Sequence, residues 1–163
     1  MLVNNAAVAA FAPSSGITED EFQREMTTNL LGTILATQAL AAQEDIDAAS
    51  IINVSTAGTV SHPPYTSLYV TSKSAVNAFT VVAARELGPR GIRVNAIMPG
   101  PSDTEGTRAM GYAGSDQEAQ AIAATPLGRT GTPDDYGPLV AFLASDDARW
   151  ITADVILASG GMR

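Results

Sequence analysis

The chain has 163 residues, of which 45% are hydrophobic and 16% charged, a composition typical of globular proteins and unlike that of disordered chains. Its net charge of −8 disfavours a nucleic-acid partner or an anionic membrane surface. The absence of cysteine excludes disulfides, thiol catalysis and thiolate metal sites, and His62 is the only histidine, so we expect no metal centre.

Short apolar runs alternate with longer amphipathic ones, which is typical of an α/β protein with a parallel sheet. Residues 1–3 indicate the end of a strand, and Thr18, with a glutamate three positions later, predicts a helix over residues 18–25. Leucine and isoleucine on one face predict a second helix over residues 28–43. Residues 50–54 are apolar on both faces, as a buried parallel strand requires.

The second half of the chain continues this alternation. Two prolines and a glycine indicate a loop before the next helix, and Gly88-Pro89 ends that helix. No repeat or linker divides the chain, so we expect one domain over residues 1–163, and no signal-like or membrane-length apolar segment occurs, so we expect a cytoplasmic protein. The predicted elements are a loop over residues 57–65, a helix over 66–87, a strand over 92–98, a glycine-rich stretch over 101–131 with a short helix over 117–124, a helix over 132–143 and a strand over 155–157.

Tyr69 and Lys73 lie four positions apart at the start of the long predicted helix, so their side chains share one face. A phenol titrates near ~10, too high for acid–base work at neutral pH, and a nearby cation lowers that pKa. An exposed tyrosine and lysine on a helix surface would give the same pattern. Lys73 is the only lysine among nine basic residues, which indicates a site that needs a compact ammonium.

Five segments in this order resemble the short-chain dehydrogenase/reductase family. They are residues 2–7, 29–32, 51–56, Tyr69-x-x-x-Lys73 and 93–101, followed by Gly160-Gly161 near the end. The resemblance covers the whole chain and implies the last four strands, with flanking helices, of a Rossmann-like, doubly wound parallel sheet. It also implies an oxidoreductase that moves hydride between NAD or NADP and an alcohol or ketone, with no membrane or nucleic-acid partner.

The resemblance implies a catalytic role for five side chains. Tyr69 would exchange the proton with the substrate oxygen, and Lys73 would lower the pKa of Tyr69 and bind the nicotinamide ribose. Asn29 would hold a water of the proton relay to the lysine. The hydroxyl that orients the carbonyl oxygen would come from Thr56, thirteen positions before Tyr69, or from Ser55 if the loop carries one more residue; Thr56 is the preferred candidate.

The cofactor-binding residues implied by the resemblance lie in two loops. Asn5, Ala6 and Ala7 match a turn that passes under the cofactor, with Ala7 in place of the usual glycine, a substitution that a negative φ tolerates. In the second loop Pro99, Gly100, Ser102 and Thr104 would meet the nicotinamide carboxamide, although Pro and Gly also favour an ordinary strand-ending turn. Met98, Met110, Tyr112, Ile122 and Leu127 are candidates for an apolar substrate pocket or for plain packing.

No glycine-rich phosphate-binding motif occurs among the fourteen glycines. We therefore expect an N-terminally truncated member of the family that needs the missing segment for full activity. One alternative is a non-catalytic remnant that serves as an oligomerising or interaction module, and another is an isomerase or dehydratase on the same scaffold. The helices that begin near Thr28 and Thr66 are those through which family members form dimers and tetramers, so we expect a homo-oligomer.

Overall fold

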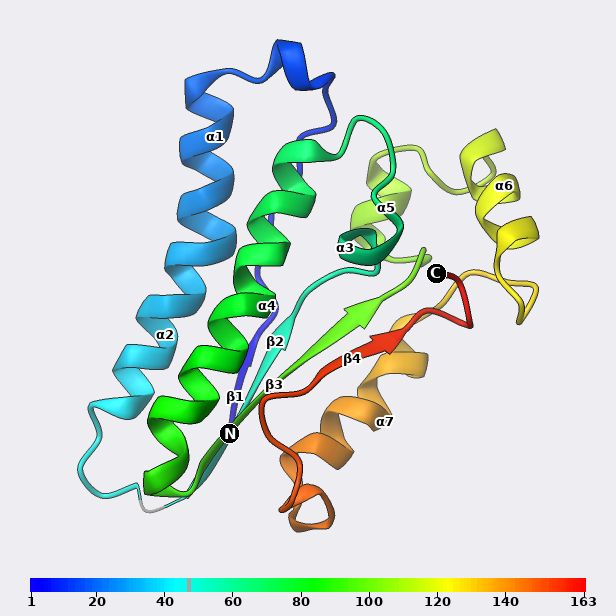
Figure 1. Ribbon diagram of the computed structural model, residues 1–163. Coiled ribbons are helices and arrows are strands. Elements are labelled where there is room, and N and C mark those ends of the chain that lie inside the picture. Colours follow the sequence, from blue (N-terminus) through cyan, green and yellow to red (C-terminus); the bar gives the residue numbers. More distant parts are fainter. Residues whose placement is uncertain (47) are drawn as a thin grey trace.

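The computed structural model describes residues 1–46 and 48–163. In this part of the chain, four parallel strands form one sheet in the order β1-β2-β3-β4 (Figure 1). Their bounds are Leu2–Asn4 for β1, Ala49–Val54 for β2, Ile92–Pro99 for β3 and Val155–Ala158 for β4. The register places Val3 opposite Ile52 and Ile97 opposite Ile156. This confirms the expected Rossmann-like α/β arrangement.

Helices cover both faces of the sheet (Figure 1). Alternate residues of β2 point to opposite faces: Ile51 packs with α2 and α4, whereas Ile52 packs against α7 and the turn that follows it. Both isoleucines are fully buried. The helices are α1 Glu19–Glu25, η2 Met26–Leu31, α2 Gly32–Ala41, α3 Gly58–Ser61, α4 Ser67–Leu87, α5 Glu105–Ala109, α6 Asp116–Ala124 and α7 Pro133–Ala144, with 3-10 turns at Ser14–Gly16, Gly88–Arg90 and Asp146–Ala148.

The two helices expected over residues 18–25 and 28–43 form one helical segment in the structure. Thr18 caps it in a capping box with Glu21, as its sequence predicts. Between α1 and α2 the segment passes through a π-helical stretch, η2, where the Gly32 N–H donates to the carbonyl of Thr27, five residues back. A hydrophobic period of 3.6 residues gives no sign of this wider turn.

Two further helical turns lie where the sequence predicts loop. α3 is a single turn within residues 57–65, and α5 follows β3 with Thr104 as its cap. Both are short, and their cap geometry rather than apolar periodicity defines them. No helix in residues 1–46 or 48–163 combines the length and apolarity needed to cross a membrane.

Candidate active site

A cavity of about 770 Å³ lies at the carboxyl ends of the strands, at the end of the sheet where α3 and α5 lie in Figure 1. Val3, Val54 and Ile97 line it from three neighbouring strands, and the first turns of α4 contribute Tyr69 and Lys73. In a parallel sheet the carboxyl ends of all strands lie at the same end of the sheet, and ligands of open α/β sheets bind there. The topology therefore places Tyr69 and Lys73 at the end of the sheet where ligands of such folds bind.

Lys73 is buried, with 3% of its surface exposed. Its Nζ donates a hydrogen bond of 2.7 Å to the carbonyl oxygen of Val54 and lies 6.0 Å from the centre of the Tyr69 ring. Burial lowers the pKa of the Lys73 amine to about 8. The amine therefore gives up its proton near pH 8, whereas the ordinary pKa of a lysine amine is 10.5.

The pKa of Tyr69 shifts in the direction opposite to the one we expected from the lysine. Burial is the largest influence and raises it, the polar side chain of Thr56 lowers it, and the carboxylate of Glu25 raises it. The Lys73 ammonium points to Val54, and no lowering by it contributes among the influences on Tyr69. The phenol therefore keeps its proton at neutral pH, which suits a proton donor.

The two candidate hydroxyls have different partners. Ser55 is 3% exposed, and its Oγ donates to the backbone carbonyl of Lys73 at 3.3 Å, which ties the end of β2 to α4. Thr56 is half-buried, lines the cavity and lowers the pKa of the Tyr69 phenol. Its Oγ1 also accepts from the Gly58 N–H at 3.2 Å. The Thr56 side chain thus lines the same cavity as Tyr69, whereas the Ser55 hydroxyl is bonded within the scaffold.

Asn29 is 1% exposed and lies in η2, behind the cavity wall. Its Oδ1 accepts from the Val8 N–H at 2.8 Å, and its Nδ2 donates to the Val8 carbonyl at 2.8 Å and to Ser72 Oγ at 3.0 Å. These bonds commit both ends of the amide to protein groups. The side chain fastens the segment after β1 to the helix layer, a role that its family match did not suggest.

The two loops proposed for the cofactor lie on the same cavity as Tyr69. Asn5 and Ala7 line it after β1, whereas Ala6 is exposed and is not among its lining residues in the described chain. The only non-glycine residues with positive φ in residues 1–46 and 48–163 are His62, Tyr65 and Ala153. Ala7 is therefore accommodated in place of glycine without backbone strain.

In the second loop Pro99, Gly100, Ser102 and Thr104 all line the cavity. Gly100 is required by packing, because a Cβ there would lie 2.8 Å from the Cα of Ser159. Ser102 Oγ donates to the Gly100 carbonyl at 2.7 Å and lies 2.6 Å from the Tyr136 hydroxyl. Thr104 caps α5 by accepting from the Thr107 N–H at 3.2 Å.

The side chains in these two loops fit the nicotinamide end of a dinucleotide. Val3 and Ile97 supply apolar walls suited to a flat ring, and Asn5 and Thr104 supply amide and hydroxyl groups suited to a carboxamide and a ribose. Clusters of three or more His, Cys, Asp or Glu side chains able to hold a metal are absent from the described part of the chain.

The apolar wall differs from the one that the sequence suggested. Met110 and Tyr112 line the cavity, but Met98 is buried and accepts from the Thr59 hydroxyl at 3.1 Å, and Leu127 lines a separate, smaller cavity. Sequence reasoning missed Phe11, whose ring meets Tyr69 edge-on at 6.2 Å between centroids. The sequence signal that could have indicated Phe11 was a single aromatic residue a few positions after the carboxyl end of a predicted strand.

Comparison with known proteins agrees with this geometry. A family model described as enoyl-(acyl carrier protein) reductase matches residues 1–163. An uncharacterized oxidoreductase of Methylorubrum extorquens is 50% identical over the whole chain and 65% of its own length, and a (3R)-3-hydroxyacyl-CoA dehydrogenase of Rattus norvegicus is 41% identical over 91% of the chain and 60% of its own. A metagenomic blue fluorescent protein solved with NADPH superposes with a TM-score of 0.90 at 34% identity, over 98% of this chain and 63% of its own. The chain thus spans 60–65% of the length of these three proteins.

Proposed function

The chain belongs to the short-chain dehydrogenase/reductase family, and on that basis we propose that it carries the catalytic part of an NAD(P)-dependent oxidoreductase acting on an alcohol or ketone. The observation that carries this proposal is the convergence of three groups on one cavity: the phenol of Tyr69, the amine of Lys73 and the hydroxyl of Thr56. A longer relative named as a dehydrogenase and a similar structure that holds NADPH support it.

A bound nicotinamide would supply the hydride in reduction and accept it in oxidation. In the direction of reduction, the Tyr69 hydroxyl donates its proton to the substrate oxygen as the C–H bond forms. The Thr56 hydroxyl donates a hydrogen bond to the same oxygen and so stabilises the negative charge that develops there. The raised pKa of Tyr69 keeps the phenol protonated until the substrate oxygen becomes basic.

Lys73 and the two loops have supporting parts in this proposal. The Lys73 ammonium, held against the Val54 carbonyl, is the proton source that restores the Tyr69 hydroxyl after reduction. Asn5, Ala7, Pro99, Gly100, Ser102 and Thr104 hold the nicotinamide end of the cofactor. Because the chain contains no glycine-rich phosphate motif, we propose that full activity needs a phosphate-binding segment from outside these residues.

The test is a titration of the 163-residue chain with NADH and NADPH, followed by nicotinamide fluorescence, together with turnover of a ketone panel. The same measurements are made on the chain extended at its N-terminus with a glycine-rich dinucleotide-binding segment, and on the Tyr69→Phe variant of each. We expect the extended chain to bind cofactor and reduce ketones, and Tyr69→Phe to bind without turnover. Full activity of the chain alone would refute the need for the extra segment.

Exposed apolar side chains on the outer helix layer support a homo-oligomer. Leu31 is 45% exposed, Leu35 54% and Val82 51%. We propose a dimer or tetramer through η2, α2 and α4, and light scattering on the eluting protein would measure its mass. A stable oligomer whose extended form neither binds cofactor nor turns over ketones would instead favour a non-catalytic interaction module. A cytoplasmic location stays a prediction from the sequence.

A further inference from the structure

The cavity has an almost uncharged lining. Among the described residues, Lys73 is the only charged side chain that lines it. Its amine is buried, and one of its three N–H groups donates to the Val54 carbonyl. Other polar groups on the wall are hydroxyls and amides, such as Ser61, Thr107 and Gln117. A substrate carboxylate or phosphate that does not reach this amine would therefore lose its hydration without gaining an ionic partner.

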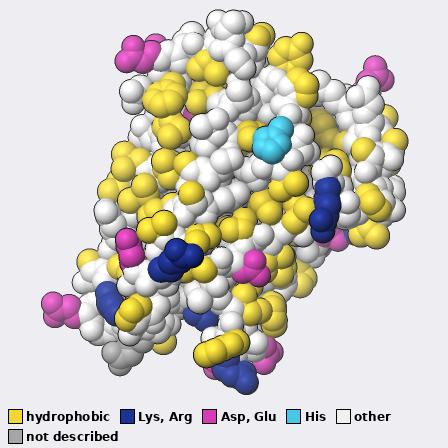
Figure 2. Space-filling model, in the orientation of Figure 1, with side chains coloured by type: hydrophobic (Ala, Val, Ile, Leu, Met, Phe, Trp, Pro, Cys, Tyr) yellow, Lys and Arg dark blue, Asp and Glu magenta, His cyan; other side chains and the backbone are white. Residues whose placement is uncertain are grey.

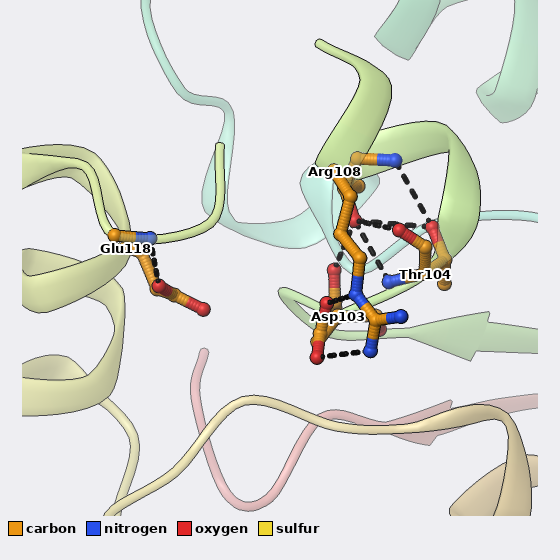
Figure 3. Close-up of polar contacts among 7 residues, drawn as sticks. Asp103, Thr104, Arg108 and Glu118 are labelled. Atoms are coloured by element: carbon orange, nitrogen blue, oxygen red, sulfur yellow. Dashed lines mark hydrogen bonds and ion pairs between the residues drawn. The ribbon is translucent and has the colours of Figure 1, made fainter. Parts of the chain in front are cut away.

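Two arginines in the chain segment beside the cavity are paired with carboxylates. Figure 3 shows Arg108 turned onto Asp103, with bonds of 2.6 and 2.7 Å from the guanidinium to the two carboxylate oxygens. Glu118 lies apart from this pair, and its Oε2 accepts from the Gly114 N–H at 2.7 Å. Arg129 is likewise paired with Asp135.

The chain after β1 builds one wall of the cavity from alternate residues. Ala7, Ala9 and Phe11 line the cavity, whereas Val8, Ala10 and Ala12 donate their N–H groups away from it. This two-residue alternation is typical of an extended chain. Alanine side chains are small, so Phe11 is the one large side chain among these three.

The position of Phe11 is fixed on both sides. The Val8 N–H and carbonyl both bond to Asn29, and the Ala10 N–H donates to Oε1 of the fully buried Glu25. On the other side, the Ala12 N–H donates to the Tyr65 carbonyl at 3.0 Å. The Phe11 ring meets Tyr69 at 78° and is still 56% exposed. A ring that is held firmly and left open beside the proton donor is a contact surface for a ligand.

Figure 2 shows that apolar side chains gather across the face of the molecule and that charged ones are few and scattered. We propose that this cavity selects an uncharged ketone or secondary alcohol whose apolar substituent, next to the reacting carbon, packs on Phe11. Phe11 is then the residue that sets specificity for that substituent. The proposal rests on the proposed function and adds the substrate class to it.

The charge requirement is tested with two matched pairs on the N-terminally extended chain. Acetophenone and phenylglyoxylate share an aryl ketone and differ in its other substituent, which is a methyl group in the first and a carboxylate in the second. Their corresponding alcohols, 1-phenylethanol and mandelate, differ in the same way. Turnover is measured with NADH and NADPH, and binding of the two alcohols by saturation-transfer NMR. We expect kcat/KM for acetophenone to exceed that for phenylglyoxylate by at least ~100-fold, and 1-phenylethanol to bind where mandelate does not.

The outcomes separate this inference from the proposed function. Equal or better use of the carboxylate compounds overturns the inference and leaves the oxidoreductase intact. Selective binding of 1-phenylethanol with no turnover of any ketone supports the inference and contradicts the proposed function. Binding of neither alcohol together with no turnover overturns both.

The role of Phe11 is tested with Phe11→Ala and a matched control. Phe142→Ala removes a phenylalanine on α7 that is 41% exposed and does not line the cavity. We expect Phe11→Ala to raise KM for acetophenone about 10-fold and to change KM for acetone less than about twofold. Phe142→Ala is expected to change neither value. An equal effect of Phe11→Ala on both ketones, or none on either, overturns the assignment.

A general structural role of Phe11 is separated from specificity by a second variant. Phe11→Leu keeps an apolar side chain on the wall but removes the flat ring. We expect it to unfold at nearly the temperature of the wild type and to retain most of the preference for acetophenone over phenylglyoxylate. If Phe11→Ala does not fold, the Phe11→Leu protein carries the test. Loss of the preference for acetophenone in that folded variant would contradict the claim that an apolar side chain at position 11 is what the cavity wall requires.

Discussion

The amine of Lys73 donates a 2.7 Å hydrogen bond to the carbonyl oxygen of Val54, so the only lysine of the chain is fastened to the carboxyl end of β2. The bond holds the ammonium in the lining of the cavity, one helical turn beyond Tyr69. Burial at this position costs the charged form more than the single hydrogen bond returns, which is why the pKa falls to about 8. A scaffold that needed only stability would place an apolar side chain here.

The first prediction is that Lys73→Met stabilises the fold and removes activity. Between about pH 8 and 10.5 the unfolded chain binds the proton that the folded protein has lost, so the stability of the wild type rises with pH across that window. Methionine carries no buried charge but leaves the Val54 carbonyl without its donor. We expect a gain of roughly 1–2 kcal/mol at pH 7, after subtraction of the lost hydrogen bond.

Urea unfolding at pH 7 and pH 10 measures this prediction. The difference between wild type and Lys73→Met is expected to shrink at the higher pH, where the wild-type amine is neutral in the folded state. A loss of stability at pH 7 would show that the bond to Val54 outweighs the cost of burial. Ketone turnover by the extended chain provides the second readout and is expected to fall at least ~100-fold.

The second prediction concerns the proton donor. Tyr69→Phe removes the hydroxyl and keeps the ring that meets Phe11, so we expect kcat to fall by roughly 10²–10⁴ while cofactor affinity and melting temperature stay close to wild type. Because burial raises the pKa of Tyr69, reduction by the wild type is expected to stay constant through neutral pH and to decline only in alkaline solution. A decline that begins below pH 7 would contradict the raised pKa.

The third prediction separates the two hydroxyls at the end of β2. Thr56→Val keeps the shape but removes the hydroxyl that lines the cavity beside Tyr69, so we expect kcat to fall about 10- to 100-fold with little change in stability. Thr56→Ser is expected to restore activity. Ser55→Ala removes a buried bond to the Lys73 carbonyl and is expected to cost about 1 kcal/mol of stability with kcat nearly unchanged. The reverse pattern would assign the catalytic hydroxyl to Ser55.

The fourth prediction concerns Glu25, whose carboxyl is fully buried and has one oxygen, Oε2, without a hydrogen-bond partner among the described residues. Burial raises its pKa above the ordinary 4.5, and the hydrogen bond from Ala10 and the charge of Arg24 oppose the shift. The folded state therefore binds this proton more tightly than the unfolded chain, and stability is lost as pH rises above 4.5 through the raised pKa.

Glu25→Gln keeps an acceptor for the Ala10 N–H without the charge. We expect it to be more stable than wild type by ~1 kcal/mol at pH 7 and about equal to it at pH 4. Thermal unfolding at the two pH values measures the difference. Glu25→Leu, which lacks the acceptor, is the control and is expected to be less stable than Glu25→Gln at both. Equal stability of the Gln variant and the wild type at pH 7 would contradict a cost from the buried carboxylate.

Local sequence patterns correctly predicted the strands and helices that are marked by apolar periodicity or by a capping residue. The apolar run before Asn53 predicted β2, and Thr18 with Glu21 predicted the start of α1. They failed at η2, where the π-helical stretch joins two predicted helices, because an inserted residue changes the hydrogen-bond ladder without changing composition. They also failed at α3 and α5, which are too short to carry a periodic signal.

The order of motifs in the sequence by itself determined the family, the α/β architecture and the candidacy of Tyr69 and Lys73, because helical spacing places these two side chains on one face whatever surrounds them. Only the tertiary structure decided the direction of the pKa of Tyr69, the partners of Ser55 and Thr56, the use of the Asn29 amide and the position of Phe11. These depend on burial and on contacts between segments distant in the chain. Desolvation arises from everything that surrounds a group, so neighbours in sequence do not reveal it.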